Sequence, residues 1–185
     1  MAYIKDGQFG FVTVMDVTVN YAWDSDLEEY TKELEIDSLR ISNITQEGPR
    51  KESRGGMNAK PLVRYGKTMR LEMEDVIMKA KSFEAFMGAE LVMDSGVPTD
   101  LERILVKEVF SKPCKIEGTT YVIDKDTGER EYVDITIFKF LPDSIFELTM
   151  ESEGDVGVMN IAGEIFPNEC GVFYVLGDGD DPCAE

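Results

Sequence analysis

The sequence predicts a mainly β protein: an antiparallel β-sandwich or barrel with one flanking α-helix and a long basic loop. Two patterns carry this prediction. Short strand-like segments separated by turn residues recur through the second half of the chain, and only one segment has a convincing helical period. At 185 residues with 43% hydrophobic content, the chain is expected to form a single β-rich domain, residues 1–185, that buries about 70% of its unfolded surface.

The N-terminal third contains three strand signals. Residues 9 to 23 form a long β-branched and aromatic run, and Leu34, Ile36, Leu39 and Ile41 indicate a second strand. Apolar and charged residues then alternate strictly from Met69 to Glu74, so one face of that strand is expected to be buried and the other solvated.

One amphipathic helix is expected over residues 76–88. Asp75 is a suitable N-cap and Gly88 a suitable stop. The apolar positions are spaced by four, three and four residues, which places them on one helical face. They are Val76, Ala80, Phe83 and Met87.

After residue 103, six strands are expected, at 104–110, 114–123, 131–140, 145–151, 157–166 and 171–176. The stretch from Asp124 to Gly128 reads as the turn of a hairpin between two of them. Asp124, Asp126 and Glu129 also suggest a calcium loop, but Gly128 and Ile135 occupy positions where that motif needs ligands. The hairpin is the better interpretation.

Positive charge is concentrated in one segment. Residues 48–70 carry seven basic side chains and one acidic one, a net of +6, within a chain whose total is −18. Residues 45–66 lack any period, and a loop of this length is usually functional or disordered. We expect it to be a basic inter-subunit loop, in contrast to residues 177–185, which read as a flexible acidic tail. The expected contact residues are Arg50, Lys51, Arg54, Lys60 and Arg64.

A nucleic acid is the alternative partner for this loop, because Arg and Lys among glycines can approach phosphates. However, only Tyr65 offers an aromatic ring for base stacking, and the rest of the chain is acidic. A protein partner is therefore favoured. For any single acidic residue elsewhere, surface solvation is the simpler explanation.

Several functional classes are disfavoured. The chain has no histidine, which removes the commonest general base and metal ligand. Its three cysteines, Cys114, Cys170 and Cys183, suggest neither a disulfide framework nor a zinc site, and they fit a reducing cytoplasm. No signal peptide or membrane-spanning run is evident. We expect no catalytic residue, no bound metal and no cofactor.

The second half of the chain resembles the major tail proteins of bacteriophages. The resemblance lies in residues 115–129, 132–140, 146–155 and 160–166, where a hairpin with a Thr-Gly turn leads through further strands to a last core strand. Upstream, the long loop followed by a strand and a single helix matches the same order. In layout the resemblance covers residues 30–176.

This resemblance implies hexameric rings that stack into a hollow tail tube, assembled in the host cytoplasm, through which DNA passes without sequence-specific binding. It also implies a tape measure protein and a tail terminator as partners, a place in the virion, and no membrane association. A head-to-tail completion protein or a baseplate tube protein is an alternative with the same fold. A small acidic ligand-binding β-barrel or enzyme is an alternative from another class.

Overall fold

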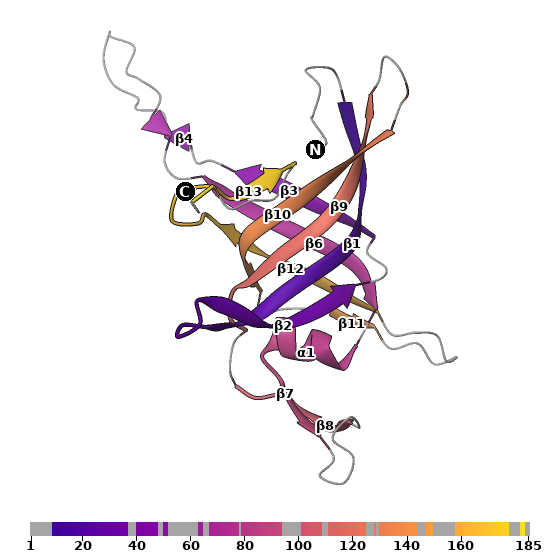
Figure 1. The fold of residues 1–185 in the computed structure, drawn as a ribbon, viewed down its shortest axis with the longest axis vertical. Coiled ribbons are helices and arrows are strands. Elements are labelled where there is room, and N and C mark those ends of the chain that lie inside the picture. Colours follow the sequence, from indigo (N-terminus) through magenta and orange to yellow (C-terminus); the bar gives the residue numbers. More distant parts are fainter. Residues whose placement is uncertain are drawn as a thin grey trace.

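A computed structural model gives the fold (Figure 1). It describes residues 9–36, 40–47, 50–51, 63–64, 67–77, 79–93, 101–108, 111–124, 128, 130–143, 147–149, 158–177 and 182–183.

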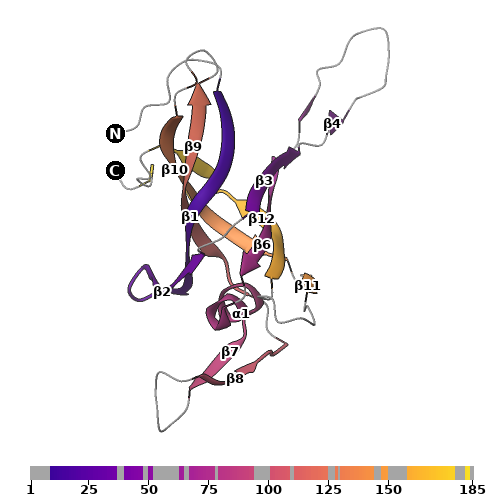
Figure 2. The same cartoon turned by 90° about the vertical axis from the view of Figure 1, so that its right-hand side faces the viewer.

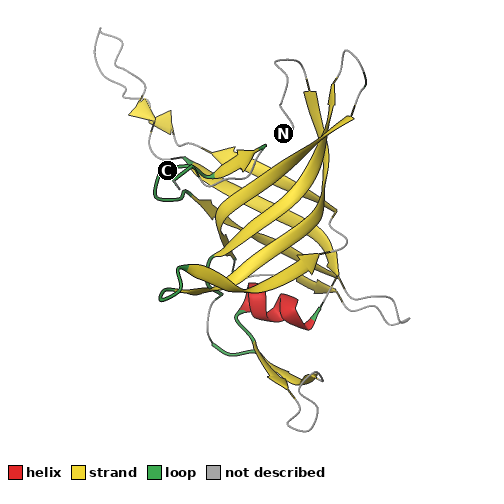
Figure 3. Cartoon of the chain, viewed as in Figure 1, coloured by secondary structure: helices red, strands yellow, loops and turns green. Residues whose placement is uncertain are grey.

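Nine of the described strands form one antiparallel sheet, in the order β2-β1-β9-β10-β12-β6-β3, with β11 beside β12 and β13 beside β10. Strands dominate the described chain, and the one helix lies at one end of the sheet (Figure 3). The sheet strands are β1 (Phe9–Asp24), β2 (Glu29–Ile36), β3 (Arg40–Glu47), β6 (Thr68–Ile77), β9 (Cys114–Asp124), β10 (Arg130–Pro142), β11 (Glu147–Thr149), β12 (Val158–Phe166) and β13 (Tyr174–Leu176). The mainly β, antiparallel fold with one helix is therefore confirmed.

The sheet folds over on itself, so that β1, β9 and β10 lie across β12, β6 and β3 (Figures 1 and 2). Between these halves lies one apolar cluster to which β1, β2, β6, β9, β10, β12 and the helix all contribute. In β6, Met69, Leu71 and Met73 are buried whereas Glu72 and Glu74 are exposed. The period-2 pattern of this strand thus predicts its orientation correctly.

Several boundaries differ from the sequence-based expectation. The segment from Leu34 to Ile41 contains the end of β2 and the start of β3, with residues 37–39 outside the described part. The strand expected at 104–110 is β8 (Leu101–Leu105), which pairs with β7 (Glu90–Met93) in a separate two-stranded ribbon. Lys107, just after β8, forms an ion pair with Glu90 of β7, which lowers the pKa of the Glu90 carboxyl.

The helix α1 (Ala80–Met87) is shorter than expected, and it buries a different face. Val76 and Ile77 belong to β6, where they pair with Met159 and Val158, so the helix starts at Ala80 rather than at residue 76. Its buried residues are Ser82, Ala85 and Phe86, whereas Phe83 and Met87 are only partly buried. Gly88 ends the helix in the left-handed conformation at φ 65°, as predicted.

Helix α1 is attached to strand β2 at the edge of the sheet. Lys79 Nζ donates a hydrogen bond to the Glu35 carbonyl at 2.9 Å, and Lys81 Nζ donates one to the Glu33 carbonyl at 3.4 Å. Lys32 of β2 forms an ion pair with Glu84 of the helix. These contacts occupy part of an edge that would otherwise present unpaired backbone groups.

The two halves of the sheet approach closely at Gly163 in β12. A Cβ atom at this position would lie 2.3 Å from the Leu141 carbonyl oxygen and 2.7 Å from the Phe140 ring. Phe140 is completely buried. Glycine is needed here because no side chain fits between β12 and β10.

Candidate assembly surfaces

The predicted basic contact residues are only partly within the described chain. Arg50 and Lys51 form β4 (Arg50–Lys51), and Arg64 ends β5 (Val63–Arg64). These two short strands pair antiparallel, with Arg50 opposite Arg64 and Lys51 opposite Val63. Arg54 and Lys60 lie outside the described residues. We refer to residues 50–51 and 63–64 as the basic ribbon.

The basic ribbon projects away from the sheet. In both views β4 lies beyond one end of the sheet, whereas α1 and the β7–β8 ribbon lie at the opposite end (Figures 1 and 2). Among the described strands, β4 and β5 pair only with each other. The backbone of Arg50, Lys51 and Arg64 thus belongs to a ribbon that extends beyond the sheet.

The remaining two basic residues of the segment, Lys67 and Arg70, interact with the body of the protein instead. The Lys67 ammonium lies 5.4 Å from the centre of the Phe173 ring, a cation–π geometry. Arg70 forms an ion pair with Asp143, and its Nε lies 3.6 Å from Glu72 Oε1. The basic segment therefore divides into an attached base and a projecting ribbon.

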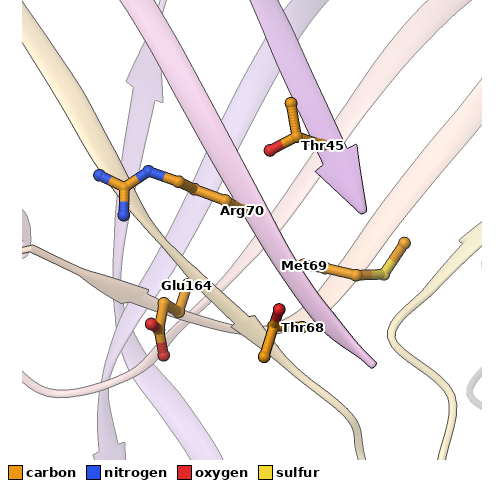
Figure 4. A pocket seen from close by; sticks show the side chains of 5 residues that line it. All are labelled: Thr45, Thr68, Met69, Arg70 and Glu164. Atoms are coloured by element: carbon orange, nitrogen blue, oxygen red, sulfur yellow. The ribbon is translucent and has the colours of Figure 1, made fainter. Parts of the chain in front are cut away.

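A shallow hollow lies at this base (Figure 4). Its volume is about 180 Å³, and its lining mixes polar and apolar side chains from β3, β6 and β12. The lining residues are Thr45, Thr68, Met69, Arg70 and Glu164. A space of this size holds a few water molecules or one inserted side chain, and we assign it no catalytic role.

The turn between β1 and β2 exposes large apolar side chains. Trp23 is 47% exposed and Leu27 is 61% exposed. The Trp23 ring meets Tyr30 edge-on, with 5.0 Å between the ring centres. Burial raises the pKa of Tyr30 to about 12. We call residues 23–30 the Trp23 tip.

Backbone geometry fixes the shape of the Trp23 tip. Asp24 Oδ1 accepts hydrogen bonds from the backbone N–H of Asp26 at 2.9 Å and of Leu27 at 3.4 Å. Ala22, just before this turn, and Glu28, at its end, both have positive φ, at 60° and 55°. Positive φ is uncommon for residues other than glycine and marks strain that the surrounding structure must hold in place.

The Trp23 tip is also acidic. Residues 24–29 include four carboxylates and no basic residue. Within the described chain, the neighbouring Lys32 is paired with Glu84 of α1 rather than with the tip. The tip therefore presents an apolar centre surrounded by negative charge.

A second exposed aromatic cluster lies where β9 and β10 pair. Tyr132, 62% exposed, meets Tyr121 edge-on with 6.2 Å between ring centres, and the Arg130 guanidinium lies 5.3 Å from the Tyr121 ring. Arg130 thus brings a positive charge to this cluster, unlike the Trp23 tip.

No group of three or more metal-ligating side chains is found within the described ranges. Of the predicted turn from Asp124 to Gly128, only the two end residues are described, and Gly128 has the expected positive φ, 71°. No helix in the described part of the chain has the length and apolar character needed to span a bilayer.

The cysteines differ from the expectation of unpaired thiols. Cys170 and Cys183 form a disulfide, with 5.9 Å between their Cα atoms. Asn168 shapes the loop that holds Cys170, because its side-chain oxygen accepts hydrogen bonds from Cys170 N at 3.1 Å and Val172 N at 2.9 Å. Cys114 is free and fully buried, and burial raises its pKa to about 12.

The sequence pattern reveals the basic segment but not the Trp23 tip. The prediction of a strand that includes Trp23 is correct, but period-2 alternation would place Trp23 on the same face as the buried Tyr21, whereas Trp23 is exposed. The available signal is the run Asp24 to Glu29, where four carboxylates in six residues indicate a solvated turn next to a tryptophan.

The model of the YomU/Tube protein family matches residues 90–175, which run from the start of β7 into β13. This match covers a little under half of the chain and confirms the resemblance to phage tail tube proteins. No curated protein matches the chain.

Proposed function

We propose that this protein is a structural subunit that polymerises, as stacked hexameric rings, into a phage tail tube through which DNA passes during delivery. The observation that carries the proposal is the family match over residues 90–175, which includes β9, β10 and β12 at the centre of the antiparallel sheet. In this role the protein is not an enzyme, and it resides in the virion after assembly in the host cytoplasm. Its partners are further copies of itself, a tape measure protein and a tail terminator.

The charge distribution supports this role. A net charge of −18 suits a lumen along which DNA slides, since phosphates find few cations to bind there. The basic loop, residues 45–66, would contact acidic surface on a neighbouring subunit through Arg50, Lys51, Arg54, Lys60 and Arg64. A contact between two different surfaces repeats from copy to copy and produces an open polymer.

Negative-stain microscopy of the concentrated protein tests the proposal directly. A tube subunit forms long hollow filaments, a completion protein forms single rings, and a ligand-binding barrel or an enzyme forms neither. Protein that stays monomeric at high concentration, measured by light scattering, contradicts the proposal.

Reversing the charge of the loop tests its electrostatic part. One exposed ion pair contributes only about 0–1 kcal/mol, so single substitutions should have little effect. Changing Arg50, Lys51 and Arg54 together to Glu should abolish filaments while leaving the circular dichroism of the folded subunit unchanged. High salt should weaken assembly of the unmodified protein. Filaments at an unchanged critical concentration would show that the loop is merely solvated.

A further inference from the structure

We propose that the Trp23 tip of one copy is the docking surface for the basic ribbon of a second copy. This inference rests on the proposed function and deepens it by naming the two surfaces that meet. The tip supplies the apolar and acidic side of the contact, and the ribbon supplies the basic side.

The tip has the side chains of an interface anchor. Trp23 and Leu27 together leave a large apolar area in solvent, although isolated exposed apolar residues are common on protein surfaces. The edge-on contact with Tyr30 holds the indole in place. A tryptophan held before binding loses little side-chain entropy when a partner covers it, and tryptophan is enriched among the residues that dominate binding.

The tip is shaped before any partner arrives. The two hydrogen bonds to Asp24 Oδ1 close the turn, and positive φ values are maintained at Ala22, just before it, and at Glu28, at its end. Backbone strain of this kind concentrates at functional positions.

The negative charge of the Trp23 tip indicates which part of a second copy binds there. Asp24, Asp26, Glu28 and Glu29 accompany Trp23 and Leu27 in this turn, and no ion pair to any of these four is found in the described part of the chain. The basic ribbon brings Arg50 opposite Arg64, with Lys51 beside them. A guanidinium can lie over an indole ring and pair with carboxylates at the same time, so arginine suits a tip of this composition.

The positions of the Trp23 tip and the basic ribbon require that their contact form between two copies of the chain. The Trp23 tip is at the end of the sheet near α1, and the basic ribbon lies beyond the opposite end (Figures 1 and 2). One chain therefore cannot bring its own tip and ribbon together, whereas a copy shifted along the long axis can supply the missing partner. The same relationship then repeats, as stacking requires.

Cross-linking between two marked chains tests the contact. One full-length chain carries Leu27→Cys and a second, bearing a mass tag, carries Arg64→Cys; both have Cys170→Ser and Cys183→Ser, which leaves only the buried Cys114. After co-assembly, a bismaleimide should join the two different chains. Tyr132→Cys is the matched control for Leu27→Cys, since the two side chains are 62% and 61% exposed. Equal cross-linking of the control, or none for Leu27→Cys in assembled protein, overturns the proposal.

Charge exchange provides the second test. Replacing Asp26 and Glu29 by Arg should raise the critical concentration for assembly about tenfold or more, and Leu27→Ser should act in the same direction. Adding Arg50→Glu and Arg64→Glu to the first variant should restore assembly. Normal assembly of the tip variants overturns this inference but leaves the proposed function standing. A native chain that never associates overturns both.

Discussion

The Tyr21 hydroxyl of β1 donates a hydrogen bond to Glu84 Oε2 of α1 at 3.0 Å and so joins the helix to the sheet. Tyr21 is buried, and both its burial and the Glu84 carboxylate raise the pKa of the hydroxyl well above its usual value. Because the bond requires a protonated hydroxyl beside a charged acceptor, Tyr21→Phe should reduce the free energy of unfolding at neutral pH by about 1–2 kcal/mol. Urea titration of this variant and of Tyr132→Phe, which removes an exposed hydroxyl, checks the expectation. Equal losses would contradict it.

The raised tyrosine pKa values predict instability in alkali. The pKa of Tyr30 is raised to about 12, against about 10 in an unfolded chain, and that of Tyr21 is raised further. A raised folded-state pKa means that the stabilisation is complete below about pH 10 and is lost as pH rises through the folded-state value. The free energy of unfolding should therefore fall between about pH 10 and pH 12. A flat profile across that window, measured by denaturant titration at each pH, would contradict the assignment.

Two phenylalanines of α1 should differ in their contribution to stability. Phe86 is 5% exposed and belongs to the core, whereas Phe83 is only partly buried against it. Phe86→Ala should therefore cost about 3–5 kcal/mol, and Phe83→Ala about 1–2 kcal/mol. The midpoints of thermal or denaturant unfolding give both values. A larger loss of unfolding free energy for Phe83→Ala than for Phe86→Ala would show that the helix buries the face predicted from the sequence.

Gly163 should tolerate no side chain. Gly163→Ala forces β12 away from the Leu141 carbonyl and the Phe140 ring, and overpacking of this kind costs about 3 kcal/mol. Gly128→Ala is the control, because no atom lies within 4 Å of its added Cβ and only the positive φ is strained. That variant should lose about 1 kcal/mol. Similar losses of unfolding free energy for Gly163→Ala and Gly128→Ala would show that β12 can shift to accept a side chain.

The disulfide should stabilise the oxidised protein only. It spans 13 residues, and closing a loop of about that length contributes roughly 3 kcal/mol in the chain-entropy description. Replacing Cys170 and Cys183 by Ser should lower the melting temperature of oxidised protein and leave that of reduced protein unchanged. Cys114 should resist alkylation in either folded form because it is buried and protonated. Three alkylated cysteines in denatured, oxidised protein would exclude the disulfide.

The strands are predictable from the sequence where one face of a strand is buried and the other solvated. The alternation in β6 survives in the structure because its register with β12 and β3 keeps Met69, Leu71 and Met73 on the core side. The predicted helix start is wrong because Val76 fits both a helical stripe and a strand. Pairing with Met159, more than eighty residues away, decides between the two, and a local period cannot contain that information.

The candidate surfaces are predictable to different degrees. Net charge is a property of composition, so the basic segment can be recognised from residue types alone. The exposure of Trp23 departs from the alternation of β1, and the disulfide depends on a loop shaped by Asn168. Both follow from three-dimensional geometry rather than from any repeating pattern.

The pairing of β1 with β9 has a consequence for how the chain folds during synthesis. Asn20 pairs with Lys115, and its side chain donates a hydrogen bond to Glu117 at 2.6 Å, so this half of the sheet closes only after about a hundred further residues have been made. At roughly 5–20 residues per second, β1 and β2 wait on the order of 5–20 seconds for their partner. Non-local pairing of this kind also makes folding slow. Each new subunit therefore passes through a period in which one edge of β1 has no partner strand. When many copies are synthesised at once, β1 must pair with its own β9 before it pairs with the exposed strand of another unfinished chain.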